Sequence, residues 1–503
     1  MRVVPKSRLG CTKPWYRVCD KCGPKAATFL FCCAAAISRL CGADPFQAMD
    51  EEVQRLVNSA NGETPTDYDR KLQELGDWIV QAKPPADVEN AARRLLLDTI
   101  ACAIAGFRKV DVSHLVDGDG DGDGDSGYGL VGMDQRLGSS ELAYAFALAA
   151  CADEACEGLA FAHGRPGLHA VAAGLGAAFR ANASLAELID AVVAGFEFGG
   201  RMGALFRAKP GIHVDGTWGL VASTVAARRM LGGDGAALAD AAAAALCQMP
   251  ASLYLPVAQG SDLRNTYSGH AAAAGMLVAA SLAGGMPSAQ GAVEAAGGFA
   301  FNRDDAAWLG PGEHLILQGY LKPYPSVRHT HYGIEAAREW RRQHGDVRPE
   351  DIGSVVLEIY PEAVTYCGNR APRTAIMGQF SLSYTLAYSL IHGDLTPAAY
   401  EPEALTNPSL QALEAAVETI PVPALAEGGQ RQARLTVEVG GKLWSSTVDN
   451  APGDSSSPLS DDYLAEKVRT FCQDRVASDR VERLIADLLT GAGTELVRGL
   501  LVP

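Results

Sequence analysis

A long alanine- and glycine-rich stretch, residues 139–301, is the feature that most restricts how this chain can fold. Its composition is typical of one helix following another, with turn signals at Pro210-Gly211, at residues 232–235 and at Pro250. Few strand-like alternations interrupt it. Because small side chains let helices approach closely, the stretch predicts a compact all-helical domain with tight helix contacts.

Two more helices are predicted upstream of this stretch. Thr66 is an N-cap followed by acidic residues in the first turn, and Pro84-Pro85 ends that helix. In the next segment, residues 88–104, apolar side chains recur at i, i+3, i+4 spacing, and Gly106 stands where a C-terminal cap belongs. We expect this second helix to bury one face completely.

The periodicity changes from helical spacing to alternation in the last third of the chain. Residues 355–360 alternate in this way. Residues 435–439 and 443–448 flank Gly440-Gly441, which predicts a hairpin with a Gly-Gly turn. A helix is expected between these strands, at residues 378–391. The region is therefore predicted to be a smaller α+β domain inserted into the helical one.

The chain returns to helical patterning at its C-terminal end. Ser460 caps a helix with acidic residues in its first turn, and helix continues to about Leu501. The predicted fold is mainly α, a large all-helical domain with an inserted smaller α+β lid domain. The predicted parts are residues 1–65, an N-terminal extension; residues 66–320 and 456–503, the helical domain; and residues 321–455, the lid.

Net charge and cysteine placement restrict the partners and the compartment. A formal net charge of -16 argues against nucleic acid or an anionic membrane as the main partner. Half of the 12 cysteines lie within the first 41 residues, and the others are scattered singly, so no disulfide framework supports the body of the protein. We expect that body to work in a reducing compartment, the cytoplasm first.

Residues 1–43 differ from the rest of the chain and leave three interpretations open. They are basic, with one acid, and their apolar run at residues 26–37 is too short to span a bilayer, which takes about 20 residues. The basic start and Cys41-Gly-Ala43 resemble a secretory signal, while many basic residues with few acids also suit an organelle transit peptide. The third interpretation is a start codon placed too far upstream, so that the sequence is over-extended at its N-terminal end.

Two short motifs invite a metal interpretation that the sequence does not favour. Cys19-Asp-Lys-Cys22 is a lone CxxC without a second ligand pair. The run from Asp117 to Asp125 alternates Asp and Gly, but an EF-hand register places Tyr128 or Leu130 where a carboxylate is needed. We expect a removed segment and a solvated loop, respectively, and no metal ion.

The segment from Gln259 to Tyr332 carries the strongest chemical signal. Cations or potential cations lie there in a small, apolar and acid-poor background, which suggests a pocket that receives carboxylates. These residues are Arg264, Lys322, Arg328, His329 and His331.

Seven short segments, in a fixed order, carry a resemblance to a known family. They lie at residues 94–106, 195–201, 211–219, 269–275, 322–325, 379–384 and 452–454. The sequence resembles the MmgE/PrpD family, whose members include 2-methylcitrate dehydratase, cis-aconitate decarboxylase and iminodisuccinate epimerase. The resemblance covers about residues 68–500 and implies a helical domain with an α+β lid, a homodimer and no cofactor.

The resemblance implies roles for several residues. His213 matches the family's active-site histidine in Gly-x-His and is the leading general acid/base, the alternative being a hydrogen-bonded core histidine. Thr217 keeps the spacing of that motif and is expected at the substrate. Lys322 matches a lysine that faces the substrate, and Tyr366 falls near a lid tyrosine. Arg328 and His331 are expected to add a second carboxylate clamp.

Other positions depart from the family's pattern. Arg264 stands where many members have lysine; it keeps the charge but cannot donate a proton, so we expect it to anchor a carboxylate. Glu154 and Glu157 stand in the acidic motif, from which Glu154 is a candidate catalytic residue; the alternative role of these carboxylates is helix capping or surface solvation. Arg165 replaces a histidine and is expected to contact an anion, or His163 or His169 takes over that histidine's task. Val327 replaces a histidine of the animal decarboxylase.

These reactions break a C–H or C–C bond beside a carboxylate, so the site must supply cations and groups that titrate near neutral pH. The first hypothesis is a cofactor-independent lyase, most simply a 2-methylcitrate-type hydro-lyase acting on a small di- or tricarboxylate. The same pocket would suit cis-aconitate decarboxylation or iminodisuccinate epimerisation. The hypothesis from another class is a non-catalytic relative that binds carboxylates without turnover.

Overall fold

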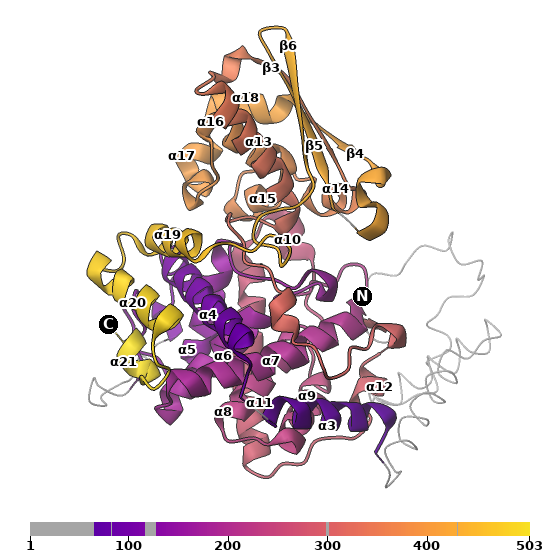
Figure 1. Cartoon of the computed structure of the whole chain (residues 1–503), viewed down its shortest axis with the longest axis vertical. Helices are drawn as coiled ribbons and strands as arrows, with labels where there is room; N and C mark the ends of the chain where they lie inside the picture. Colours follow the sequence, from indigo (N-terminus) through magenta and orange to yellow (C-terminus); the bar gives the residue numbers. More distant parts are fainter. Residues whose placement is uncertain (1–64, 82, 116–126, 298–300, 430, 503) are drawn as a thin grey trace, which may run out of the picture. The chain divides into compact units, whose positions relative to one another are not determined.

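The described part of the chain is mainly helical and carries two small β-sheets (Figure 1). The computed structural model describes residues 65–81, 83–115, 127–297, 301–429 and 431–502. The predicted leader, the Cys19 to Cys22 pair and the run from Asp117 to Asp125 are outside these residues, so those interpretations stay predictions. In the described ranges no helix combines the length and apolar character needed to cross a bilayer.

The helical body is built from segments on both sides of the sheet-bearing region. Its helices are α3 (Asp67–Val80), α4 (Ala86–Gly106), α5 (Ser139–Ala152), α6 (Pro166–Ala181), α7 (Leu185–Leu205), α8 (Gly219–Met230), α9 (Gly235–Leu246), α10 (Leu255–Gln259), α11 (Thr266–Ala283), α12 (Ala292–Ala296), α19 (Asp461–Cys472), α20 (Ser478–Thr490) and α21 (Val497–Leu501). A two-stranded antiparallel sheet joins β1 (Phe206–Ala208) to β2 (Phe301–Arg303).

Small residues allow close helix contacts, as predicted. A Cβ at Gly195 of α7 would lie 2.5 Å from the carbonyl oxygen of Ala222 on α8, and a Cβ at Gly275 of α11 would lie 2.5 Å from the Ser223 side chain. Contacts this short exclude any side chain larger than hydrogen at either position. Helix α8 therefore packs directly against α6, α7 and α11.

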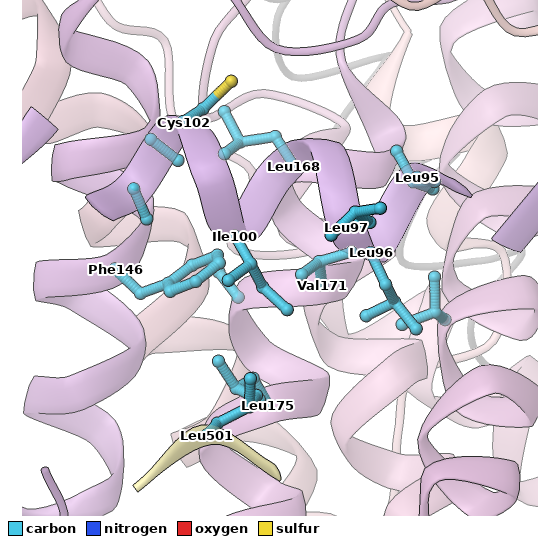
Figure 2. Close-up of a cluster of buried hydrophobic side chains, with 14 of the residues drawn as sticks. Leu95, Leu96, Leu97, Ile100, Cys102, Phe146, Leu168, Val171, Leu175 and Leu501 are labelled. Atoms are coloured by element: carbon cyan, nitrogen blue, oxygen red, sulfur yellow. The ribbon is translucent and has the colours of Figure 1, made fainter. Parts of the chain in front are cut away.

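Helix α4 is the centre of the largest core. From Leu95 to Gly106 every residue is buried, so the helix buries its whole circumference there and not one face as predicted. Figure 2 shows its side chains near Phe146 of α5 and near Leu168 and Val171 of α6, while Leu501 of α21 lies beside Leu175 of α6 in the same cluster. Gly106 is the last helical residue and not the cap, and a Cβ there would overlap the carbonyl oxygen of Ala149.

Several local signals act as the sequence predicts. The Thr66 side chain accepts a hydrogen bond from the amide of Asp69, whose carboxylate accepts one from the Thr66 amide. Ser460 accepts a hydrogen bond from the Tyr463 amide at the start of α19. The helix predicted to run from there to about Leu501 is instead three helices, because the chain leaves helical geometry after Cys472 and again after Thr490.

The second sheet has the strand order β4-β3-β5-β6. Its strands are β3 (Ile352–Ile359), β4 (Val417–Pro421), β5 (Ala433–Val439) and β6 (Lys442–Val448). Strand β4 pairs parallel to β3, and the other pairs are antiparallel. The predicted hairpin is confirmed: Gly440 and Gly441 have φ values of 58° and 75°, which a two-residue turn of this type requires. Strand β4 was not predicted, because five residues that end in proline carry little strand signal.

Helices accompany this sheet. They are α13 (His331–His344), α14 (Pro361–Cys367), α15 (Ala375–Gln379), α16 (Leu382–His392), α17 (Pro402–Leu405) and α18 (Pro408–Ala416). Figure 1 shows α13, α16 and α18 beside the sheet, and the core there joins side chains from both layers. The helix predicted at residues 378–391 is broken at Phe380, since the Ser381 hydroxyl caps a new helix by accepting from the Tyr384 amide.

The chain enters and leaves the sheet-bearing region at adjacent points. The amide of Leu321 donates to the carbonyl of Gly453 over 3.1 Å, and Gly453 takes a φ of 95° that brings its backbone against Leu321. Lys467 of α19 donates to the carbonyl of Lys322 over 2.8 Å. This fastening places Lys322 beside the helical body.

Candidate active site

Five charged side chains from separate loops and turns meet in one buried cluster, called here the charged cluster. None is more than 6% exposed. Its members are Glu154, in the loop after α5; Arg165, at the start of α6; Asp215, in the loop before α8; Arg264, in the 3-10 turn Asp262–Asn265; and Lys322, at the start of the sheet-bearing region.

Glu154 is the residue that joins the cluster together. Lys322 Nζ lies 2.6 Å from Glu154 Oε1 and donates to the Glu154 carbonyl over 2.9 Å. Arg264 Nη2 donates to Oε2, and Arg165 Nη1 lies 3.5 Å from the same oxygen. Burial would raise the pKa of Glu154, but these three cations outweigh it and hold the pKa well below its ordinary value.

The backbone at Glu154 is strained. Its φ of 51° lies in the left-handed region, which a residue other than glycine adopts at a cost of about 1–3 kcal/mol. The hydrogen bond from Lys322 to the Glu154 carbonyl holds this conformation. Lys467 Nζ, paired with Asp98 at 2.6 Å, also donates to the carbonyl of Ala155 over 2.8 Å. The strain is therefore maintained by specific contacts.

Asp215 is held by a fork of two arginines. Arg165 donates through Nε to Oδ1 over 3.2 Å and through Nη2 to Oδ2, and Arg264 Nη1 donates to Oδ2 over 3.2 Å. Burial would raise the pKa of Asp215, but Arg165, the neighbouring His213 ring and Arg264 lower it. Both carboxylates of the cluster are therefore ionised at neutral pH.

The charged cluster holds one more cation than it has carboxylates. Arg165, Arg264 and Lys322 face Glu154 and Asp215, and no other acid among the described residues forms an ion pair with these three cations. Arg264 Nε is buried without a hydrogen-bond partner in the described chain. The acid-poor background holds for the segment from Gln259 to Tyr332 alone, because acids from outside that segment, Glu154 and Asp215, pair with the cations. One positive charge of the cluster is still unbalanced, and one donor, Arg264 Nε, is still without a hydrogen-bond partner among the described residues.

His213 lies at the edge of this cluster with its ring fixed. Its Nδ1 accepts a hydrogen bond from the Asp215 amide over 3.0 Å, so the neutral imidazole carries its hydrogen on Nε2. Nε2 makes no hydrogen bond to any described residue. Burial, reinforced by the charges of Arg264 and Arg165, lowers the pKa of His213 to about 4. At neutral pH the ring is an uncharged donor.

A row of aromatic rings leads from His213 to the sheet-bearing region. Tyr254 stacks on His213 with ring centroids 5.8 Å apart, and Tyr366 of α14 meets Tyr254 edge-on at 6.5 Å. His329 then stacks on Tyr366 at 6.0 Å with an interplanar angle of 10°. Tyr366 is 48% exposed. We call these four residues the aromatic row.

Comparison with known protein families identifies the chain. Residues 73–302 match the MmgE/PrpD N-terminal domain, and residues 324–490 match the MmgE/PrpD C-terminal domain. This chain belongs to the MmgE/PrpD family. The family is one of enzymes, and the activity that the comparisons support at this level is that of a lyase. The mainly α fold with a small sheet domain is that of an MmgE/PrpD protein.

Curated relatives of this MmgE/PrpD chain come from fungi. A cis-aconitate decarboxylase of Aspergillus terreus (strain NIH 2624 / FGSC A1156) is 26% identical over 61% of this chain and 68% of the relative. Another cis-aconitate decarboxylase of Aspergillus terreus is 24% identical over 81% of this chain and 89% of the relative. The cis-aconitate decarboxylase-like protein oryM of Aspergillus oryzae (strain ATCC 42149 / RIB 40) is 24% identical over 83% and 93%, respectively.

Thr217 and His169, both predicted to contact the substrate, make hydrogen bonds within the loops around the charged cluster. The Thr217 hydroxyl donates to the carbonyl of Val214 and is buried, so it shapes the loop that carries His213. His169 Nδ1 bonds the Arg165 carbonyl over 2.8 Å, and its ring fills the space beside Gly219, where a Cβ would lie 2.5 Å from it. Burial lowers the pKa of His169. Both side chains support the loops around the cluster.

Three other predicted residues make no hydrogen bond or ion pair to the charged cluster. Arg328 pairs with Asp454 and lies 4.7 Å from the centre of the Tyr320 ring. His331 is buried, with Nε2 3.2 Å from the carbonyl oxygen of Ser326. His163 is exposed at the end of the 3-10 turn Ala160–Ala162. The clamp expected from Arg328 and His331 is directed into the sheet-bearing region.

Glu157 differs from Glu154 although both belong to one short motif. Both are buried, which excludes surface solvation. Glu157 Oε1 accepts from the Leu168 amide in the first turn of α6 over 2.8 Å, so helix capping is what this carboxyl does. Burial raises its pKa to about 8, and Oε2 has no partner among the described residues. Glu157 is therefore uncharged at neutral pH.

The sequence interpretation missed Asp215, Tyr254 and the supporting pair of Lys467 and Asp98. Asp215 had a signal, since it follows His213 by two residues inside a quoted motif. The pair had a weaker one, since Asp98 is a lone acid within an otherwise apolar helix segment. The described residues hold no group of three or more His, Cys, Asp or Glu side chains that could bind a metal ion.

Proposed function

We propose that this chain is a cofactor-independent lyase that decarboxylates a small tricarboxylate of the cis-aconitate type. The observation that carries the proposal is the surplus positive charge of the charged cluster beside a neutral histidine with a free Nε2–H. The names of the relatives point to the same substrate. A polycarboxylate supplies the negative charge that the cluster lacks.

Substrate binding would use the cations that Glu154 and Asp215 hold in place. A substrate carboxylate at the cluster would find Lys322 and Arg264 already oriented, and the unpartnered Arg264 Nε would donate to it. Preorganised cations of this kind cost little to reorient when the anion arrives. The anion would also offset the one excess positive charge.

Decarboxylation needs a proton donor, which fits the tautomer of His213. The bond between carbon and the departing carboxylate breaks, CO₂ leaves, and the electron pair moves into the remaining unsaturated carboxylate system. One proton then adds to carbon, so a trianion and a proton give a dianion and CO₂. Binding of the anion raises the pKa of His213, and the ring takes up a proton from solvent at Nδ1, which then faces the Asp215 carboxylate, 3.8 Å away, in place of the Asp215 amide. The imidazolium then delivers its Nε2 proton to carbon.

Dehydration of a 2-methylcitrate-type substrate is the second candidate. One observation favours it: Val327 packs with Val257, Ile376 and Phe380, so an apolar contact occupies the place where the animal decarboxylase has a histidine. Dehydration requires a base for the C–H proton and an acid for the leaving hydroxyl. His213 could supply only the acid in its present tautomer, which is why decarboxylation is ranked first. A homodimer, implied by the family resemblance, is part of either proposal.

The test is an assay of the purified full chain with cis-aconitate, 2-methylcitrate, citrate and iminodisuccinate, followed by NMR of products and CO₂ release. We expect CO₂ from cis-aconitate, and a loss of about 10²–10⁴-fold in kcat for His213→Phe, which keeps the ring stack but removes the donor. Water loss from 2-methylcitrate would support the second candidate. Full activity of His213→Ala would overturn the role of His213, and binding without turnover would indicate a non-catalytic relative.

A further inference from the structure

A second histidine at the far end of the aromatic row has the same features as His213. His329 belongs to the 3-10 turn Arg328–Thr330, and its Nδ1 lies 2.7 Å from the Tyr360 hydroxyl. Its Nε2 makes no hydrogen bond to any described residue, and the side chain keeps partial exposure. In both histidines one nitrogen is fixed by the protein and the other is free.

The surroundings of His329 keep it uncharged. Burial and the nearby charges of Arg431 and Arg328, together with His163 and Lys322, lower the pKa of His329 to about 3. Burial also holds the pKa of Tyr360 well above its ordinary value, so the phenol keeps its hydrogen and is available as a donor to Nδ1. With the phenol as the donor, the hydrogen of the neutral ring is on Nε2, and this is the tautomer on which the inference below is built.

The position of His329 connects it to the charged cluster. The charge of Lys322, which is bonded to Glu154, contributes to the lowered pKa of His329. The pKa of Tyr254, in the middle of the row, is influenced electrostatically by Arg264, Glu154 and Tyr366. The row therefore borders the cluster and ends in a free N–H on each side. A free donor beside several cations is a suitable partner for an anion.

We propose that His329 is a substrate-binding residue whose Nε2–H donates to a carboxylate of the polycarboxylate substrate, opposite His213. Tyr254 and Tyr366 form the wall between the two histidines. The inference rests on the proposed function, since it assigns a second carboxylate subsite to the same site. Because the ring is neutral, its contribution is a directed hydrogen bond and not a charge.

The experiment compares variants of the full chain in cis-aconitate binding and turnover. His329→Phe keeps the stack on Tyr366 and removes the donor, so KM and the calorimetric Kd should rise by about ten- to hundredfold, the range for one hydrogen bond to a charged group. His329→Gln keeps an N–H near the same place and should recover most of the affinity. Neither change should reduce kcat as strongly as His213→Phe.

His344 provides a matched control. It stacks on Trp340 at 5.0 Å and bonds the Trp340 carbonyl through Nδ1 over 2.8 Å, but it lies at the other end of α13. His344→Phe should therefore leave KM unchanged, and equal melting temperatures would show that all variants fold. A Kd and KM for His329→Phe within threefold of wild type would overturn the inference. Wild-type protein that neither binds nor converts cis-aconitate would overturn the proposed function itself.

Discussion

Two buried groups of charges in this protein are arranged in opposite ways. Arg201 and Glu197 form a pair on α7 in which Arg201 also donates to the carbonyls of Leu309, Gly310 and Glu313. Glu197 accepts from the amides of Leu315 and Ile316. That pair balances its charges and holds a loop. The charged cluster around Glu154 keeps an excess cation and an unpartnered donor. Charge balance therefore distinguishes the Arg201–Glu197 pair, which supports the fold, from the charged cluster, which can receive a ligand.

The largest effect on stability is expected at the balanced pair. Arg201→Leu leaves the buried Glu197 with only the His314 ring, 3.8 Å away, within ion-pair distance among the described residues, so the free energy of unfolding should fall by about 3–5 kcal/mol. Denaturant titration measures this change. The turnover of the molecules that remain folded should stay near the wild-type value, and a selective loss of activity would contradict a purely structural role.

Glu157 should reveal its neutral state through pH. Its folded-state pKa of about 8 lies above its ordinary value of 4.5, so its contribution to stability is complete below pH 4.5 and is lost as the pH rises towards 8. Between pH 5 and pH 8, the free energy of unfolding of the wild type should fall relative to that of Glu157→Gln by up to about 1.4 kcal/mol per pH unit. Parallel stability curves for the two proteins would show that Glu157 is ionised when folded.

The smallest loss of stability is expected within the charged cluster, because its partners are redundant. After Arg264→Leu, Glu154 keeps Lys322 and Asp215 keeps Arg165, so the free energy of unfolding should fall by only about 1–3 kcal/mol. The free energy of unfolding should fall less for Arg264→Lys, because lysine keeps the positive charge and lacks only the two-pronged geometry of the guanidinium group. The comparison of the two regions fails if Arg264→Leu destabilises the protein as much as Arg201→Leu does.

Local signals made much of the fold predictable. Ser460 caps its helix and Gly440-Gly441 forms its turn because each depends on a few neighbouring residues. Strand β4 was missed because its pairing with β3 joins residues about sixty positions apart. The extent of burial around α4 was also missed, since it depends on helices that the periodicity of one segment does not describe.

For the site, too, local signals could be predicted from the sequence and contacts between distant residues could not. The cations of the charged cluster and Glu154 could be found from motifs in the sequence, but their pairing could not, because Glu154 meets Lys322 across 168 residues and Arg264 across 110. Contacts between residues that far apart in sequence leave no mark on a local pattern. The roles of His213, Lys322 and the other predicted residues stay predictions that the assays above test.

The hydrogen bond between Leu321 and Gly453 has a consequence for how such a protein can change over generations. The two crossings of the polypeptide meet side by side, so the sheet-bearing region is an insertion whose two ends are neighbours. Recombination at these two positions could replace one wall of the site with another version while the helices that hold Glu154, His213 and Arg264 remain unaltered. New substrates would then be reached by exchanging a block of sequence.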